Sequence, residues 1–156
     1  EQFAAVISED RQDDLLSAYH ELLTSPDDKK RMEAAIAWSL YETACSSLYP
    51  NYETITTDDQ KAQAQALARI ESHYFLNGVI SEEKSLTKGI DKIRSIPSTI
   101  IHGRYDVICP IHTAYHLHTI WPEADYIVVP DSGHSSLDDG VRTRLIEATE
   151  NAKTLR

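Results

Sequence analysis

The N-terminal part of the chain, residues 1 to about 92, carries apolar side chains at helical spacing and almost no strand pattern. The spacing predicts three helices at about residues 8–23, 28–48 and 58–77, followed by a short helix and linker from 79 to 92. Acidic residues precede the first apolar repeat, which is favourable at a helix N-terminus. We therefore predict an all-α region.

The pattern changes at Ile96-Pro97. Ser98–His102 is a β-branched run, and 126–130 is a second continuous apolar segment of the kind found in parallel sheets. Helical spacing over 111–121 follows the first strand, and over 137–152 it follows the second. This order predicts a βαβα unit with parallel strands and a right-handed crossover.

An acid and a histidine follow the two predicted strands. Asp106 lies in the loop after the first strand and His134 in the loop after the second. Because the carboxyl ends of parallel strands meet at one sheet edge, we expect the two side chains to lie together. An acid that orients a histidine base, in this chain order, is the second half of the Ser, Asp, His triad of α/β-hydrolases. The alternative for Asp106 is a turn or cap residue before Pro110, and for His134 a surface loop position.

Four motifs carry a more specific resemblance: Ala37–Glu42, Ala68–Phe75, Ile101–Asp106 and Gly133–Ser135. In this order and spacing they resemble the proline iminopeptidase family of α/β-hydrolases, over about residues 10 to 150. The resemblance implies an α/β fold class, with a helical cap domain at 1–92. It also implies that 93–156 holds the C-terminal strands and helices of an α/β-hydrolase core, with the acid and histidine of the triad.

The resemblance implies a serine-type aminopeptidase that releases N-terminal proline from peptides, with Asp106 and His134 as catalytic residues and without a cofactor. It also implies that Glu42 and Glu71 bind the free amino end of the substrate. Pairing of these glutamates with an arginine, Arg31 or Arg69, is the alternative. 

Three further groups of residues bear on the site. Cys109 follows Asp106 closely, so we expect it near the substrate, with a small buried hydrophobe as the alternative. His112 and His116 have the i, i+4 spacing of metal ligands but no third ligand on that face, so we predict no metal site. The histidines other than His134 are predicted to be structural or solvent-facing.

The nucleophile is the main departure from the family pattern, because no Gly-x-Ser-x-Gly occurs in the sequence. We expect the nucleophile region to lie upstream of Glu1, and the 156-residue chain to be an inactive fragment. Its two strands lack the neighbours that would pair with them and cover them, so we expect self-association or association with the missing N-terminal half. The rival hypotheses are another capped α/β-hydrolase, such as an epoxide or carbon–carbon bond hydrolase, and a non-catalytic helical interaction module from a split gene.

Charge and composition indicate which classes of binding partner are disfavoured and in which compartment the protein lies. The chain has 25 acidic and 15 basic residues, a formal net charge of -10, which disfavours nucleic acid and anionic membranes. No apolar run approaches the roughly 20 residues that span a bilayer, and the first residues lack a signal-peptide pattern. The two cysteines, Cys45 and Cys109, suit thiols in a reducing compartment. We predict a soluble, cytoplasmic protein.

Overall fold

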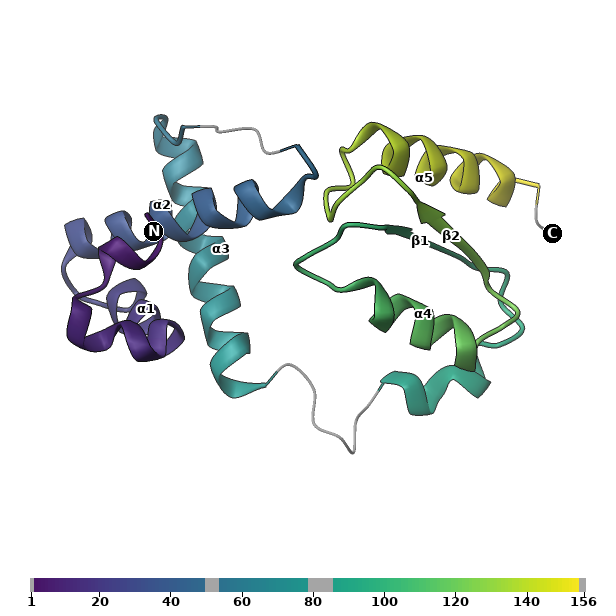
Figure 1. The fold of residues 1–156 in the computed structure, drawn as a ribbon, viewed down its shortest axis with the longest axis horizontal. Helices are drawn as coiled ribbons and strands as arrows, with labels where there is room; N and C mark the ends of the chain where they lie inside the picture. Colours follow the sequence, from purple (N-terminus) through teal and green to yellow (C-terminus); the bar gives the residue numbers. More distant parts are fainter. Residues whose placement is uncertain (1, 50–53, 79–85, 155–156) are drawn as a thin grey trace. The chain divides into compact units, whose positions relative to one another are not determined.

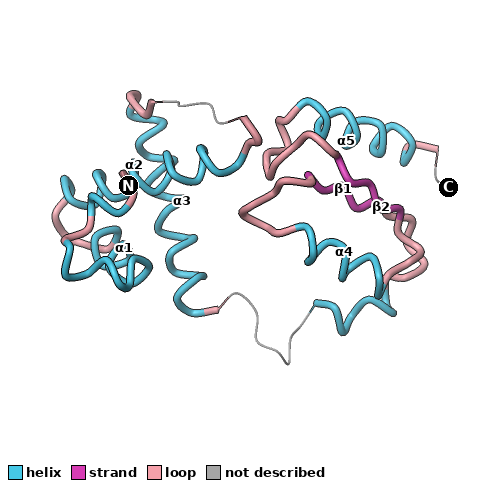
Figure 2. Tube along the Cα trace, in the orientation of Figure 1, coloured by secondary structure: helices cyan, strands magenta, loops and turns pink. Residues whose placement is uncertain are grey.

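A computed structural model describes residues 2–49, 54–78 and 86–154 of the chain (Figure 1). The chain divides into two compact units. The first comprises Glu1–Ala44 and Tyr52–Ser81, and the second comprises Cys45–Asn51 and Glu82–Arg156. The first unit is helical, and the strands belong to the second (Figure 2).

The first unit is built on three α-helices, as the apolar spacing predicts. They are α1 (Leu15–Leu23), α2 (Asp28–Ser46) and α3 (Asp58–Asn77). Two 3-10 helices, Ala4–Val6 and Glu9–Asp14, precede α1, so the helix predicted from residue 8 begins as a 3-10 helix. The last two residues of α2 already group with the second unit.

Local capping sets the ends of these helices. The Asp14 side chain accepts a hydrogen bond from the Ser17 N–H at the start of α1. Thr57 and Gln60 form a reciprocal capping box at the start of α3, which satisfies two backbone donors. α3 ends at Gly78, whose φ of 70° favours glycine. The predicted glycine stop is confirmed.

An aromatic cluster forms the core of the first unit. Tyr19 is fully buried, and its ring stacks on Phe3 with centroids 4.3 Å apart. Trp38 meets Tyr19 edge-on at 5.5 Å. The Tyr19 hydroxyl donates to the Phe3 carbonyl at 2.7 Å, and burial raises the pKa of Tyr19. Ala34, Ala35 and Ala68 are also completely buried, and such small residues let helices approach closely.

The second unit has the predicted βαβα order. After a 3-10 helix, Leu86–Lys92, come β1 (Thr99–Gly103), α4 (Ile111–Ile120), β2 (Asp125–Val129) and α5 (Asp139–Ala152). The strands are parallel, with Ile101 opposite Ile127. Residues 86–92 hold part of the predicted helix and linker, and 79–85 lie outside the described residues.

The second unit has three layers. α4 and α5 lie on opposite sides of the two-stranded sheet (Figure 1), and both contact β1. Its buried apolar cluster is small and consists of Ile90, Trp121 and Ala124. Among the described residues, no helix combines the length and the apolar character needed to cross a membrane.

Candidate active site

Asp106 is held in the loop that follows β1. Its side chain is only 4% exposed. One carboxylate oxygen, Oδ1, accepts hydrogen bonds from the backbone N–H groups of Ile108 at 3.0 Å and Cys109 at 2.7 Å. This is the turn geometry that was the alternative to a catalytic role. It uses only one of the two oxygens.

The other oxygen of Asp106 faces His134, in the loop that follows β2. Oδ2 lies 2.9 Å from His134 Nδ1. A carboxylate can only accept, so His134 Nδ1 donates, and the neutral ring keeps Nε2 as an acceptor. The His134 side chain is 40% exposed, so it is accessible to solvent. The turn and the histidine contact therefore coexist on different oxygens.

Backbone contacts hold the two loops together. The Arg104 N–H donates to the Val129 carbonyl at 2.9 Å, and the Tyr105 N–H donates to the Ser132 carbonyl at 3.0 Å. Gly103, the last residue of β1, approaches the second loop so closely that a Cβ there would overlap the Gly133 carbonyl oxygen. The close approach of the loops requires glycine at this position.

The His134 loop has a second set of backbone contacts. The N–H groups of His134 and Ser135 both donate to the Ser46 carbonyl, at 2.6 and 2.8 Å. Ser46 groups with the second unit. The Gly133 N–H donates to Asp138 Oδ2 at 2.8 Å, just before α5 begins. Neither Ser46 nor Asp138 can be found from the sequence, because a backbone acceptor has no residue-type signal and an acid before a helix is common.

The sequence matches a known protein family over most of its length. The family described as "alpha/beta hydrolase fold" matches residues 1–141. The chain belongs to the α/β-hydrolase fold family. The predicted fold class is confirmed.

Relatives within the hydrolases are named proline iminopeptidases. That of Xylella fastidiosa (strain 9a5c) is 42% identical over 152 residues, covering 97% of this chain and 49% of the relative. That of Arabidopsis thaliana is 41% identical over 157 residues, covering 99% and 41%. That of Neisseria gonorrhoeae is 36% identical over 152 residues, covering 97% and 47%. The chain thus spans about half the length of these relatives, and the resemblance to this group is confirmed.

Cys109 lies in the same loop as Asp106. Its backbone N–H is one of the two that hold Asp106 Oδ1. Cys109 is exposed, so the alternative of a buried hydrophobe is wrong, and neither Cys109 nor Cys45 forms a disulfide.

Glu42 and Glu71 lie on α2 and α3 of the first unit, and both are partly buried. The Glu71 carboxylate accepts a hydrogen bond from the Trp38 indole N–H at 2.7 Å. Arg31, one of the two arginines considered as a partner, pairs with Asp28 instead. The sequence predicts only charged partners for Glu71, so its contact with an indole is a difference that the structure reveals.

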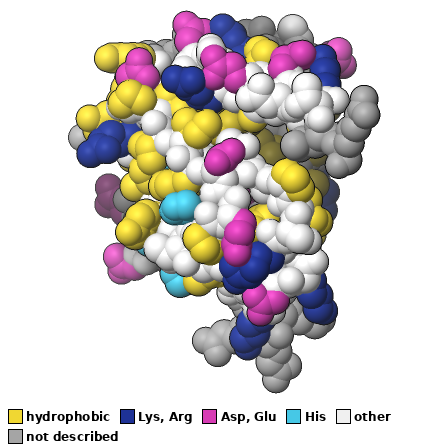
Figure 3. Space-filling model, turned by 90° about the vertical axis from the view of Figure 1, so that its right-hand side faces the viewer, with side chains coloured by type: hydrophobic (Ala, Val, Ile, Leu, Met, Phe, Trp, Pro, Cys, Tyr) yellow, Lys and Arg dark blue, Asp and Glu magenta, His cyan; other side chains and the backbone are white. Residues whose placement is uncertain are grey.

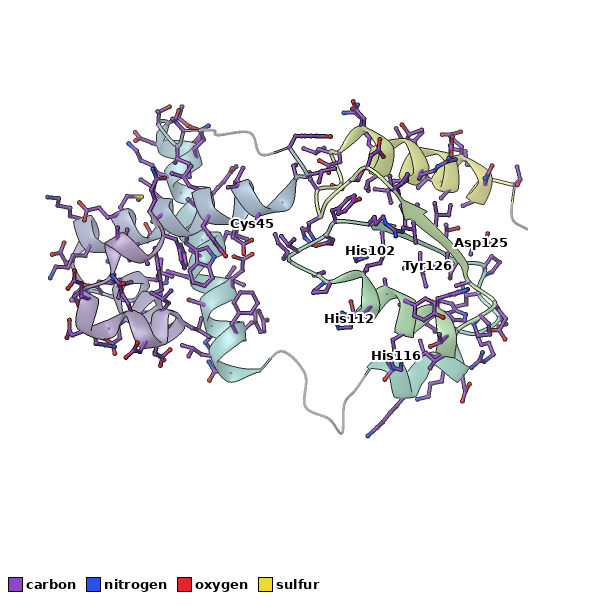
Figure 4. The ribbon with its side chains drawn as sticks, viewed as in Figure 1. Cys45, His102, His112, His116, Asp125 and Tyr126 are labelled. Carbon is purple, nitrogen blue, oxygen red and sulfur yellow. The ribbon has the colours of Figure 1, made fainter. Side chains whose placement is uncertain are left out.

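The two histidines with metal-ligand spacing both lie on α4. Figure 4 labels His112 and His116 along this helix. In the part of the chain that the structure describes, no group of three or more His, Cys, Asp or Glu side chains is arranged to hold a metal ion.

Proposed function

We propose that this chain supplies the acid and the base of a serine-type prolyl aminopeptidase, which releases N-terminal proline from peptides. The observation that carries the proposal is the 2.9 Å contact between His134 Nδ1 and the buried carboxylate of Asp106. The names of the relatives support the substrate class.

In this mechanism Asp106 holds the proton of His134 on Nδ1, so that Nε2 can accept a proton. Nε2 takes the proton of a serine hydroxyl as the serine oxygen attacks the peptide carbonyl. Asp106 stabilises the imidazolium that forms, and the same proton then passes to the leaving amine. The serine belongs to a segment beyond these 156 residues, since no Gly-x-Ser-x-Gly occurs in them.

Glu42 and Glu71 recognise the amino end of the substrate in this proposal. An aminopeptidase that releases proline must bind a charged secondary amine, and carboxylates beside aromatic rings provide charge and an apolar wall. Trp38 restrains the Glu71 carboxylate through its indole N–H. Cys109 lies near the substrate because it adjoins Asp106.

We also propose that the second unit associates with a segment equivalent to the other half of these relatives or, without it, with another copy. A two-stranded sheet is marginal alone. Large hydrophobic side chains are exposed on this unit: Val107, Tyr115, Leu137 and Ile146. On the face that Figure 3 turns to the viewer, hydrophobic side chains are exposed among charged and other polar ones. We also place the protein in the cytoplasm, because two cysteines without metal-type or redox-type spacing suit a reducing compartment.

The catalytic proposal is tested by proline release from a chromogenic prolyl substrate. We expect no release by the chain alone, and release when it is combined with an N-terminal hydrolase half that carries Gly-x-Ser-x-Gly. Asp106→Asn should lower kcat by about 10⁴ because the histidine takes the wrong tautomer. Proline release by the purified chain alone, or an active Asp106→Asn variant, would refute the proposal.

The amine-binding proposal is tested in the same combined enzyme. Glu71→Gln keeps an acceptor for the Trp38 indole but removes the charge, so we expect KM for free prolyl substrates to rise about tenfold or more. Glu42→Gln should act in the same direction, and Glu33→Gln on α2 is the matched control. Unchanged KM in both variants, with N-blocked substrates hydrolysed equally well, would show that the glutamates have another role.

The association proposal is tested by light scattering on the purified chain. Self-association that rises with concentration, and is replaced by a one-to-one complex when the N-terminal half is added, is the expected result. A monomer at all concentrations that ignores the N-terminal half would contradict it.

A further inference from the structure

A second histidine, His102, lies beside Asp106. It lies on β1, where Figure 4 labels it. Its side chain is only 14% exposed. Its Nε2 is 2.8 Å from the Cys109 carbonyl oxygen and 3.4 Å from Asp106 Oδ2. The sequence predicts a structural or solvent-facing position for this histidine. His102 therefore lies close both to the Asp106 carboxylate and to the backbone of the loop that holds it.

The contact with Cys109 determines which nitrogen of His102 carries a proton. A backbone carbonyl only accepts, so Nε2 of His102 is protonated and donates to it. At 3.4 Å the same N–H is too far from Asp106 Oδ2 for a strong second hydrogen bond, although it still directs positive charge toward that oxygen. The main partner of His102 is therefore the backbone of the Asp106 loop.

This bond completes the restraint of Asp106. The N–H of Cys109 donates to Asp106 Oδ1, while the carbonyl of Cys109 accepts from His102. The residue that fixes Oδ1 is thus itself attached to β1 at its other backbone group. With Oδ1 held in this way, the carboxylate presents Oδ2 to His134.

We propose that His102 is a positioning residue for Asp106. By holding the Cys109 backbone it orients the carboxylate, and so sets the hydrogen bond that keeps the His134 proton on Nδ1. This inference rests on the proposed pairing of Asp106 with His134 as acid and base. It adds a residue that acts on the Asp106–His134 pair through the Asp106 loop.

A metal role does not fit the same three residues. Nε2 of His102 already donates its proton to the Cys109 carbonyl oxygen. Oδ1 of Asp106 already accepts from two backbone N–H groups. His102, Asp106 and His134 do not form a metal-binding group in the described part of the chain.

The test is the tautomer of His134 in the full 156-residue chain, measured from its imidazole ¹⁵N shifts at a pH where the ring is neutral. In the unaltered chain we expect the Nδ1–H form to dominate. His102→Leu removes the donor to Cys109 and should lower the ratio of Nδ1–H to Nε2–H by about tenfold. His102→Gln can place an amide N–H near the position of Nε2 and should keep the original ratio. His116→Leu, on α4, is the control and should change nothing.

Two further variants separate the possible failures. Asp106→Asn should invert the tautomer; if it does not, the Asp106–His134 pairing itself is wrong. If Asp106→Asn inverts the tautomer but His102→Leu leaves it unchanged, or if His102→Gln behaves like His102→Leu, the positioning role is refuted. Should His102→Leu lose its dispersed amide spectrum, His102→Asn replaces it. Its shorter amide cannot reach Cys109, so a lowered ratio supports the role and an unchanged ratio refutes it.

Discussion

The two units differ in which of their buried polar groups have hydrogen-bond partners. In the first, the Tyr19 hydroxyl and the Trp38 indole N–H both find acceptors, the Phe3 carbonyl and Glu71. Only the Ser39 hydroxyl is buried without a partner among the described residues of this unit. Side chains of the aromatic core thus carry the polar contacts that specify its packing.

In the second unit a large set of hydrogen-bonded polar groups lies at the loop edge of the sheet. Asp106 and the backbone of both loops form a continuous set of hydrogen bonds. Behind the loops, two buried polar atoms, His118 Nδ1 and the Tyr126 hydroxyl, have no partner within the described residues. We infer that backbone geometry at the loops specifies this unit, and aromatic side chains specify the other.

We expect the largest loss of stability from Gly103→Ala, and we expect it in the second unit. The added Cβ would overlap the Gly133 carbonyl and lie 2.7 Å from the Ser132 carbonyl, and neither backbone group can move independently. We expect a loss of about 3 kcal/mol in the second unit, at the upper end of overpacking effects. Amide hydrogen exchange on β1 and β2 measures it.

Gly89→Ala is the matched control for this variant, because a Cβ at Gly89 meets nothing within 4 Å. It should change the free energy of unfolding by less than about 1 kcal/mol. Equal exchange protection in the two variants would show that the loop backbone does not specify the second unit.

Trp38→Phe and Trp121→Phe sharpen the comparison, since the same change is made at one buried tryptophan in each unit. Trp38 donates to a carboxylate at 2.7 Å, whereas Trp121 donates to the Arg94 carbonyl at 3.3 Å. Charged acceptors make stronger hydrogen bonds, so we expect costs of about 2 and 1 kcal/mol beyond the shared loss of packing. Thermal unfolding of the two variants gives the order, and a larger cost at Trp121 would reverse our interpretation.

The sequence predicts the order of elements and the meeting of Asp106 with His134, because both follow from local periodicity and parallel strands. Contacts that depend on packing between distant segments could not be predicted. Trp38 and Glu71 lie on different helices, and nothing in either segment selects an indole over an arginine as the donor. His102 and Cys109 meet through a backbone carbonyl, which every residue has.

Tyr19→Phe tests whether the first unit depends on its satisfied polar groups. The change leaves the Phe3 carbonyl without its 2.7 Å donor in a buried site while keeping the ring stack. We expect a loss of about 1 kcal/mol at neutral pH, measured by urea unfolding. A variant as stable as the unaltered chain would mean that the stacked rings alone hold this core.

Tyr126→Phe should have the smallest effect, because the Tyr126 hydroxyl has no partner among the described residues while its ring stacks on His118 at 5.1 Å. Removing an unpaired buried hydroxyl should cost less than about 0.5 kcal/mol at pH 7, or stabilise the unit.

Burial raises the pKa of Tyr126 above its ordinary value. A raised folded-state pKa contributes stability that is fully present below the unfolded value, about 10, and is lost as the pH rises through the folded value. The phenylalanine variant lacks this loss, so its melting temperature should exceed that of the unaltered chain increasingly above pH 10. A clear destabilisation at pH 7 would show instead that the hydroxyl has a partner, and that the second unit is specified by its side chains as the first is.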